Sequence, residues 1–158
     1  MDINFLEFCG YVKTNVIAVI KETGDVQPAV LCIYKRKNQK VPQVQTLIMG
    51  EESEHSIQII RQHIKKTKPV GVVGIHSLWI IIKASTEPPM SRDTSMTEIL
   101  RDGIECVLIE GADEDKNRYA FCQPIQRLDN RIILPEPIDL STGICQSDLL
   151  DGLFDTIH

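Results

Sequence analysis

Two polar residues interrupt the most apolar stretch of the sequence. His76 and Ser77 lie within residues 70–83, which are otherwise rich in valine and isoleucine. A polar pair in a buried strand must either find hydrogen-bond partners or reach a surface. The pair therefore predicts either a satisfied core histidine or a pocket at the end of a sheet, where His76 and Ser77 are candidates for catalysis.

Cys145 is a candidate nucleophile of another kind. It precedes a predicted helix that starts at Ser147, and a position at a helix N-terminus lowers the pKa of a thiol. A catalytic thiol also needs a general base, and no spacing pairs a histidine with Cys145. The other cysteines are far apart, which predicts small buried side chains rather than a zinc site. They are Cys9, Cys32, Cys106 and Cys122.

The residues around His76 and the order of the predicted elements resemble the JAMM/MPN metalloprotease-like domains, over roughly residues 3–140. The resemblance implies a strand that ends in a His-Ser-His-Pro ligand motif, followed by Ser-x-x-Asp. His76 and Ser77 match the first two positions of the first motif. Asp93 stands for the aspartate ligand.

Departures from the family pattern bear on its chemistry. Leu78 and Trp79 stand where the family has its second histidine and its proline, and the upstream glutamate falls near Gln27. A catalytic zinc needs three protein ligands, an open position for water and a base that activates the water. The resemblance therefore implies either a metal-dependent hydrolase with further ligands still to be identified, or the inactive scaffold form of one.

Two basic segments could act together as one surface patch. The first is a predicted turn at 35–40, and the second is the last turn of a predicted helix, where lysines also suit the helix dipole. The patch comprises Lys35, Arg36, Lys37, Lys40, Lys65, Lys66 and Lys68. It could bind nucleic acid or an anionic surface. However, the chain is acidic and only Tyr34 could stack nearby, so nucleic acid is not expected.

An acidic segment imitates the start of a calcium loop. Asp113, Asp115 and Asn117 occupy the first ligand positions, but Arg118 stands where such a loop needs glycine. The segment therefore predicts an acidic hairpin turn. No phosphate-binding loop is present either, and we expect no cofactor.

The composition is that of one globular domain. The chain has 158 residues, of which 42% are hydrophobic and 25% charged, enough for a core without disulfides. It opens without a signal-peptide pattern, and its longest apolar run is too short to span a bilayer. Five dispersed cysteines suit a reducing compartment. These features predict a soluble, cytoplasmic protein with no membrane association.

Charge is distributed unevenly along the chain. Residues 31–70 contain eight Lys/Arg and three Asp/Glu, whereas residues 101–158 contain five and twelve. Such segregation predicts either a partner chosen by electrostatics or segments that face each other in the fold.

The hydrophobic pattern predicts an α+β fold, a single domain over residues 1–158 with a mixed or antiparallel central sheet flanked by helices. The predicted order is α-β-β-α-β-α-β-β-β-α. The expected elements are a helix from Phe5 to Gly24, a hairpin of strands 29–34 and 41–49, a helix between Ser53 and Pro69, a central strand 70–83, a helix 95–100, strands 105–110, 118–126 and 131–134, and a helix 147–154. Residues 15–21 are β-branched, so a strand is the alternative there.

No complete catalytic motif is present. The leading hypothesis is therefore a non-enzymatic interaction or regulatory module that binds an unknown protein partner through a surface patch or an exposed strand edge. The alternatives are the JAMM-like hydrolase or its inactive form, and an anion binder at the Lys35–Lys40 turn. Short closing strands would leave a sheet edge that needs cover, and a homodimer is one way to cover it.

Overall fold

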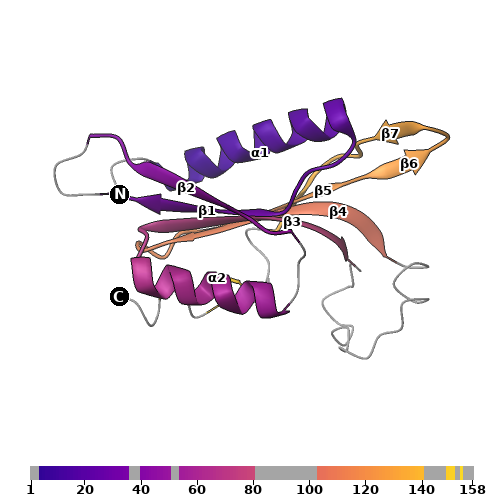
Figure 1. The fold of residues 1–158 in the computed structure, drawn as a ribbon. Helices are drawn as coiled ribbons and strands as arrows, with labels where there is room; N and C mark the ends of the chain where they lie inside the picture. The colour runs from indigo at the N-terminus through magenta and orange to yellow at the C-terminus, as the bar shows by residue number, and fades with distance from the viewer. Residues whose placement is uncertain are drawn as a thin grey trace, which may run out of the picture.

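The computed structural model describes residues 4–35, 40–50, 54–80, 103–140, 149–151 and 154. Within these residues the chain forms two helices, a six-stranded sheet and a small two-stranded hairpin. The two helices lie on opposite faces of the sheet (Figure 1). The predicted α+β class is confirmed. Every described strand pair is antiparallel, so the mixed sheet that was the other expectation is not what forms.

The order of the strands in the large sheet is β2-β1-β3-β4-β5-β8. The predicted central strand is confirmed as β3, and the predicted hairpin as β1 and β2. The elements are α1 (Phe5–Thr23), β1 (Ala29–Tyr34), β2 (Gln43–Ile48), α2 (Glu54–Thr67), β3 (Gly71–Ile80), β4 (Ile104–Asp113), β5 (Arg118–Pro124), β6 (Gln126–Leu128), β7 (Arg131–Ile133) and β8 (Ile138–Asp139).

Local signals define both ends of α1. The Asn4 side chain accepts hydrogen bonds from the backbone N–H groups of Leu6 and Glu7, as an N-cap does. Gly24 ends the helix at φ 84°, a left-handed conformation that glycine adopts without strain, and its N–H donates to the carbonyl of Ile20. The predicted helix is thus confirmed over residues 15–21, and the alternative of a strand there is wrong, because Val16 belongs to the buried stripe of α1.

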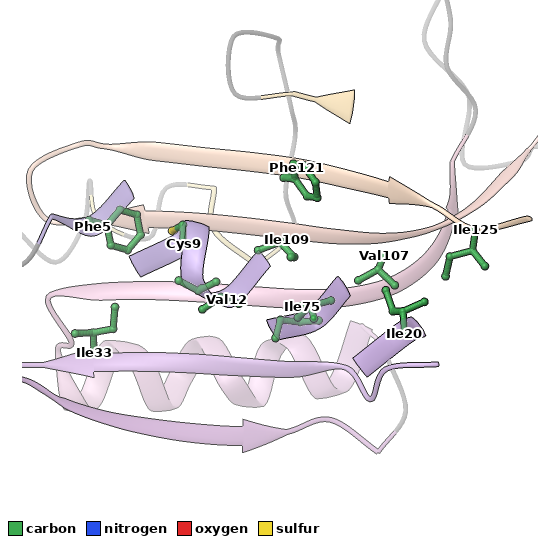
Figure 2. Packing of buried hydrophobic residues seen from close by; sticks show 12 residues of the cluster. Phe5, Cys9, Val12, Ile20, Ile33, Ile75, Val107, Ile109, Phe121 and Ile125 are labelled. Carbon is green, nitrogen blue, oxygen red and sulfur yellow. The ribbon is translucent and has the colours of Figure 1, made fainter. Parts of the chain in front are cut away.

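The main core lies between α1 and the sheet. The side chains that α1 buries recur every three or four residues, the period that puts them on one helix face. They pack on the residues of β3, β4 and β5 that point to that face (Figure 2). The buried members are Phe5, Cys9, Val12, Val16, Ile20, Ile33, Val73, Ile75, Val107, Ile109, Phe121 and Ile125.

A second core lies on the opposite face of the sheet. Ile60 and Ile64 are the buried residues of α2, and they pack with Val30 and Cys32 of β1 and with neighbouring side chains. Leu149, Leu150 and Phe154 from the end of the chain complete this cluster. Successive residues of a strand point to opposite faces, so β3 contributes to both cores. It is covered on both sides over residues 71–76, as predicted, whereas Trp79 near its end is 45% exposed.

The predicted strand 118–126 divides into β5 and β6, and the predicted strand 131–134 does not join the large sheet. Instead β7 pairs with β6. Asp129 and Asn130 connect them with φ of 43° and 64°, which is the geometry of a two-residue hairpin turn. Arg127 on β6 donates hydrogen bonds to the Glu105 carboxylate at 3.0 Å and to the Gly24 carbonyl at 2.9 Å.

Some predicted elements lie outside the described residues. The predicted helix 95–100 is one of them, as is Ser53, the expected cap of α2. Of the predicted helix 147–154, only Leu149–Asp151, which form a turn, and Phe154 are described. No helix in the described part of the chain is long and apolar enough to cross a membrane.

Candidate functional site

The most prominent sequence candidate, His76, is paired with a carboxylate that sequence reasoning missed. His76 on β3 and Glu110 on β4 project from the face of the sheet that α2 covers. Their side chains are 8% and 5% exposed, and the His76 Nε2 and Glu110 Oε1 atoms are 2.9 Å apart. A signal for Glu110 existed, because it is a charged residue directly after the apolar run of residues 106–109.

A glycine makes the contact between these two side chains possible. Gly74 is opposite Glu110 in the β3–β4 register and two residues before His76. A Cβ atom at position 74 would stand 2.7 Å from the His76 Nε2 atom and 2.7 Å from the Leu149 Cδ2 atom. The imidazole therefore occupies the space that a side chain at position 74 would fill.

The remaining candidates are not brought together with His76. Ser77 is next to His76 on β3 and so points to the opposite face, towards α1. Asp93 and Cys145 lie outside the described residues. Within the described residues no three His, Cys, Asp or Glu side chains form a group that could hold a metal ion. The ligand set implied by the JAMM/MPN resemblance therefore stays a prediction.

The four described cysteines are all buried and free, as their separation along the sequence predicted. Cys106 on β4 and Cys122 on β5 project from the same face of the sheet on neighbouring strands. A hydrogen bond from the Cys106 thiol to the Cys122 sulfur, together with burial, raises the pKa of Cys106. The same hydrogen bond lowers the pKa of Cys122. This pairing depends on strand register and has no signal in the sequence.

The acidic segment forms a turn, as predicted. The buried Asp113 carboxylate accepts hydrogen bonds from the backbone N–H of Asp115 and Asn117 and from the Asn117 side chain, at 2.9–3.1 Å. These bonds hold the turn between β4 and β5. The Asp113 carboxylate, which imitates a calcium ligand in the sequence, is thus an acceptor of hydrogen bonds that stabilise the turn.

A groove brings parts of the two predicted basic segments together. It has a volume of about 840 Å³, and Lys35 at the end of β1 and Lys68 after α2 both line it. The Gln45 side chain in its wall accepts a hydrogen bond from the Tyr34 hydroxyl and hydrogen bonds with His63. Lys40, Lys65 and Lys66 are exposed but do not line the groove, and Arg36 and Lys37 lie outside the described residues.

Strand β2 forms one edge of the large sheet and is the most exposed long strand. Five of its six residues are exposed, and none is charged. Val44 and Ile48 are 46% and 67% exposed. Natural proteins protect such edges with charges, prolines or bulges, whereas β2 has none of these over its unbroken register with β1. The opposite edge is β8, which has only two residues.

The hydrogen-bond pattern shows which backbone groups face outwards from this edge. The Met49 N–H donates to the Pro28 carbonyl at 2.9 Å, one pair beyond the end of the β1–β2 ladder. Antiparallel strands alternate hydrogen-bonded and non-hydrogen-bonded pairs, so Gln45 and Leu47 also bond to β1. The backbone N–H and C=O groups of Val44, Thr46 and Ile48 therefore point away from the sheet, and no described residue pairs with them.

Apolar side chains flank this edge on both faces of the sheet. Val44 and Ile48 project to the face that carries α1, because they pair with Ile33 and Ala29. On the other face, His63 of α2 contacts Gln45 of β2. Ile59 is one helical turn before His63, on the same side of α2, and is 53% exposed.

Comparison with known protein families, with curated proteins and with solved structures finds no match for this chain. Its function must therefore be inferred from the geometry of its own residues.

Proposed function

We propose that this chain is a non-enzymatic interaction module that binds a partner protein by adding a strand to the edge of its sheet. The observation that carries this proposal is the open edge of β2. Three N–H and three C=O groups, those of Val44, Thr46 and Ile48, face away from the sheet without a described partner. A strand that pairs there gains main-chain hydrogen bonds, and alternate side chains give specificity.

The environment of the edge supports a protein partner. Exposed apolar side chains on both faces, Val44 and Ile48 on one and Ile59 on the other, would be removed from water by an added strand and the residues next to it. The catalytic alternative has less support among the described residues, because the His76 imidazole is buried and in contact with the Glu110 carboxylate.

Hydrogen exchange at single-residue resolution tests whether the edge is open. In dilute protein, the amides of Val44, Thr46 and Ile48 are expected to exchange at least about tenfold faster than those of Gln45 and Leu47, which donate to β1. An extended peptide or protein that pairs with β2 should slow the exchange of the first three amides alone. Equal protection of the Thr46 and Gln45 amides in a chain that is monomeric by sedimentation equilibrium would contradict the proposal.

Variants separate strand pairing from catalysis. Thr46→Pro removes one outward-facing donor and no bond to β1, so it is expected to abolish partner binding and retain the fold. Asp93→Ala and Cys145→Ala remove other candidate catalytic groups and are the matched controls, expected to leave binding unchanged. Loss of biological activity in either control would favour an enzyme instead.

A second candidate function, the binding of an anionic ligand, is favoured by one observation. Lys35 and Lys68, which belong to the two separate basic segments of the sequence, line the same groove. Two ammonium groups next to an imidazole and polar side chains make an environment that suits a phosphate or another polyanion. Lys68 also follows the carbonyl end of α2, where a cation offsets the helix dipole, so this function ranks second.

A charge-reversal experiment tests the anionic ligand. A fluorescent single-stranded oligonucleotide is expected to bind at low salt, with an affinity that falls steeply as salt rises. Lys68→Glu should weaken binding by at least about tenfold, since it replaces an attraction by a repulsion. Lys21→Glu, at an exposed position on α1, changes the net charge equally and should have little effect on the affinity for the oligonucleotide. Equal weakening by both variants, or no binding at low salt, would dispose of this function.

A further inference from the structure

We propose that the partner of β2 is a second copy of this chain, paired antiparallel about a two-fold axis that passes through Thr46. The inference rests on the proposed strand-addition function and names its partner. Two six-stranded sheets would join into one continuous sheet of twelve strands. The interface would be isologous, with the same surface contributed by each copy.

The outward-facing backbone groups limit the registers in which β2 can pair with itself. Only Val44, Thr46 and Ile48 can form hydrogen-bonded pairs across the interface, because the residues between them bond to β1. A two-fold axis through Thr46 pairs it with its own copy and places Val44 of each chain opposite Ile48 of the other. This register uses all three residues and pairs the two exposed apolar side chains of β2 with each other.

Such a pairing also covers apolar surface on both faces of the sheet. The Val44–Ile48 pairs would lie on the face that carries α1, where side chains directly opposite are in contact. Ile59 lies on the side of α2 that is next to β2, and 53% of it is exposed in the single chain. A second copy added at this edge would bring its own α2 to the same face of the joined sheet.

Charges at the two ends of β2 favour an antiparallel copy over a parallel one. The residues before β2 are basic, and Lys40 is the described member of that group. The residues after β2 are acidic and include Glu54, at the start of α2. In an antiparallel pair the start of one strand lies next to the end of the other, so opposite charges meet. A parallel pair would place like charges together.

Charge substitutions at Thr46 test the partner and the register together. Thr46 is exposed and its backbone does not bond to β1, so its side chain can change without loss of the fold. The wild-type chain is expected to be dimeric by sedimentation equilibrium. Thr46→Lys and Thr46→Glu should each weaken the dimer by at least about 100-fold, because two like charges meet at the axis. An equimolar mixture of the two variants should form a heterodimer.

Controls keep this result specific. Asn15→Lys, on an exposed position of α1, adds the same charge away from β2 and should leave the dimer intact. Thr46→Val keeps the outward backbone donor and should also dimerise, with circular dichroism to verify the fold of each variant. A dimer that tolerates both charges at Thr46, or variants that fail to associate when mixed, would overturn the proposed interface.

Hydrogen exchange over a range of protein concentrations separates this inference from the function on which it rests. Protection of Val44, Thr46 and Ile48 amides that rises with concentration supports the homodimer. A monomer in which these amides exchange rapidly at every concentration overturns the homodimer but leaves an open edge for another partner. A monomer in which they are always protected overturns both, because the edge would then be covered within the chain.

Discussion

Replacing Glu110 by alanine is expected to lower the free energy of unfolding by about 1–3 kcal/mol, the usual cost of leaving a buried polar group without its hydrogen-bond partner. The substitution takes the carboxylate from the His76 Nε2 atom and leaves a cavity on the face of the sheet that α2 covers, where both side chains are at most 8% exposed. A loss of this size is a large part of the stability of an ordinary domain. Urea denaturation followed by circular dichroism measures it.

Two further variants show whether the loss of stability comes from breaking the contact between His76 and Glu110. Glu22→Ala removes a carboxylate from an exposed position on α1 and should change stability by less than about 0.5 kcal/mol. Replacing His76 and Glu110 together by leucine should cost less than Glu110→Ala alone, because the double variant fills the space and neither member of the pair is left without the other. If Glu110→Ala were as stable as the wild type, the pair would not stabilise the fold, and His76 would again be a candidate for catalysis.

The Cys9 thiol is expected to resist alkylation in the folded protein by a factor of about 1,000 or more. Burial, with a further contribution from the Asp113 carboxylate, raises the pKa of Cys9 from 9.0 to about 12. The thiolate is the reactive form, and a pKa raised by about three units lowers the thiolate fraction at pH 8 by about 1,000-fold. Because Cys9 is also 0% exposed, access of the reagent is restricted as well.

Iodoacetamide labelling at pH 8 followed by peptide mass spectrometry measures this protection. Cys32, whose pKa burial raises from 9.0 to about 11, should have a thiolate fraction about 100-fold lower at pH 8, and both thiols should label readily in urea. The pKa is raised, so protection should hold through the neutral range and decline only as the pH approaches 11–12. Rapid labelling of Cys9 in the folded chain at pH 8 would show that α1 does not pack on the sheet as described.

The elements that the sequence predicted well are those whose signals are local. The spacing of Phe5, Cys9, Val12 and Val16 predicts α1, and Gly24 marks its end because glycine adopts the left-handed conformation without strain. The apolar run of β1 and the charged turn after it predicted the first hairpin. The Asp129–Asn130 turn is also a local signal, and it indicates that residues 131–133 pair with β6 and not with the large sheet.

The features that sequence reasoning missed depend on pairing between distant segments. His76 meets Glu110 only because the β3–β4 register places Gly74 opposite Glu110, and no pattern in either strand specifies that register. The large sheet has an edge at the two-residue strand β8, and its longer open edge is β2, because β1 pairs with β3 on its other side. The two basic segments reach one groove only through this same arrangement.

One side chain connects three parts of the fold that are distant in sequence. The Arg127 guanidinium bonds both to Glu105 at the start of β4 and to the carbonyl of Gly24 at the end of α1. Fraying of the last turn of α1 and detachment of the β6–β7 hairpin therefore break the same bonds. The two events are expected to form a single cooperative unit of local unfolding, so the C-terminal end of α1 is only as stable as a hairpin that lies about a hundred residues further along the chain.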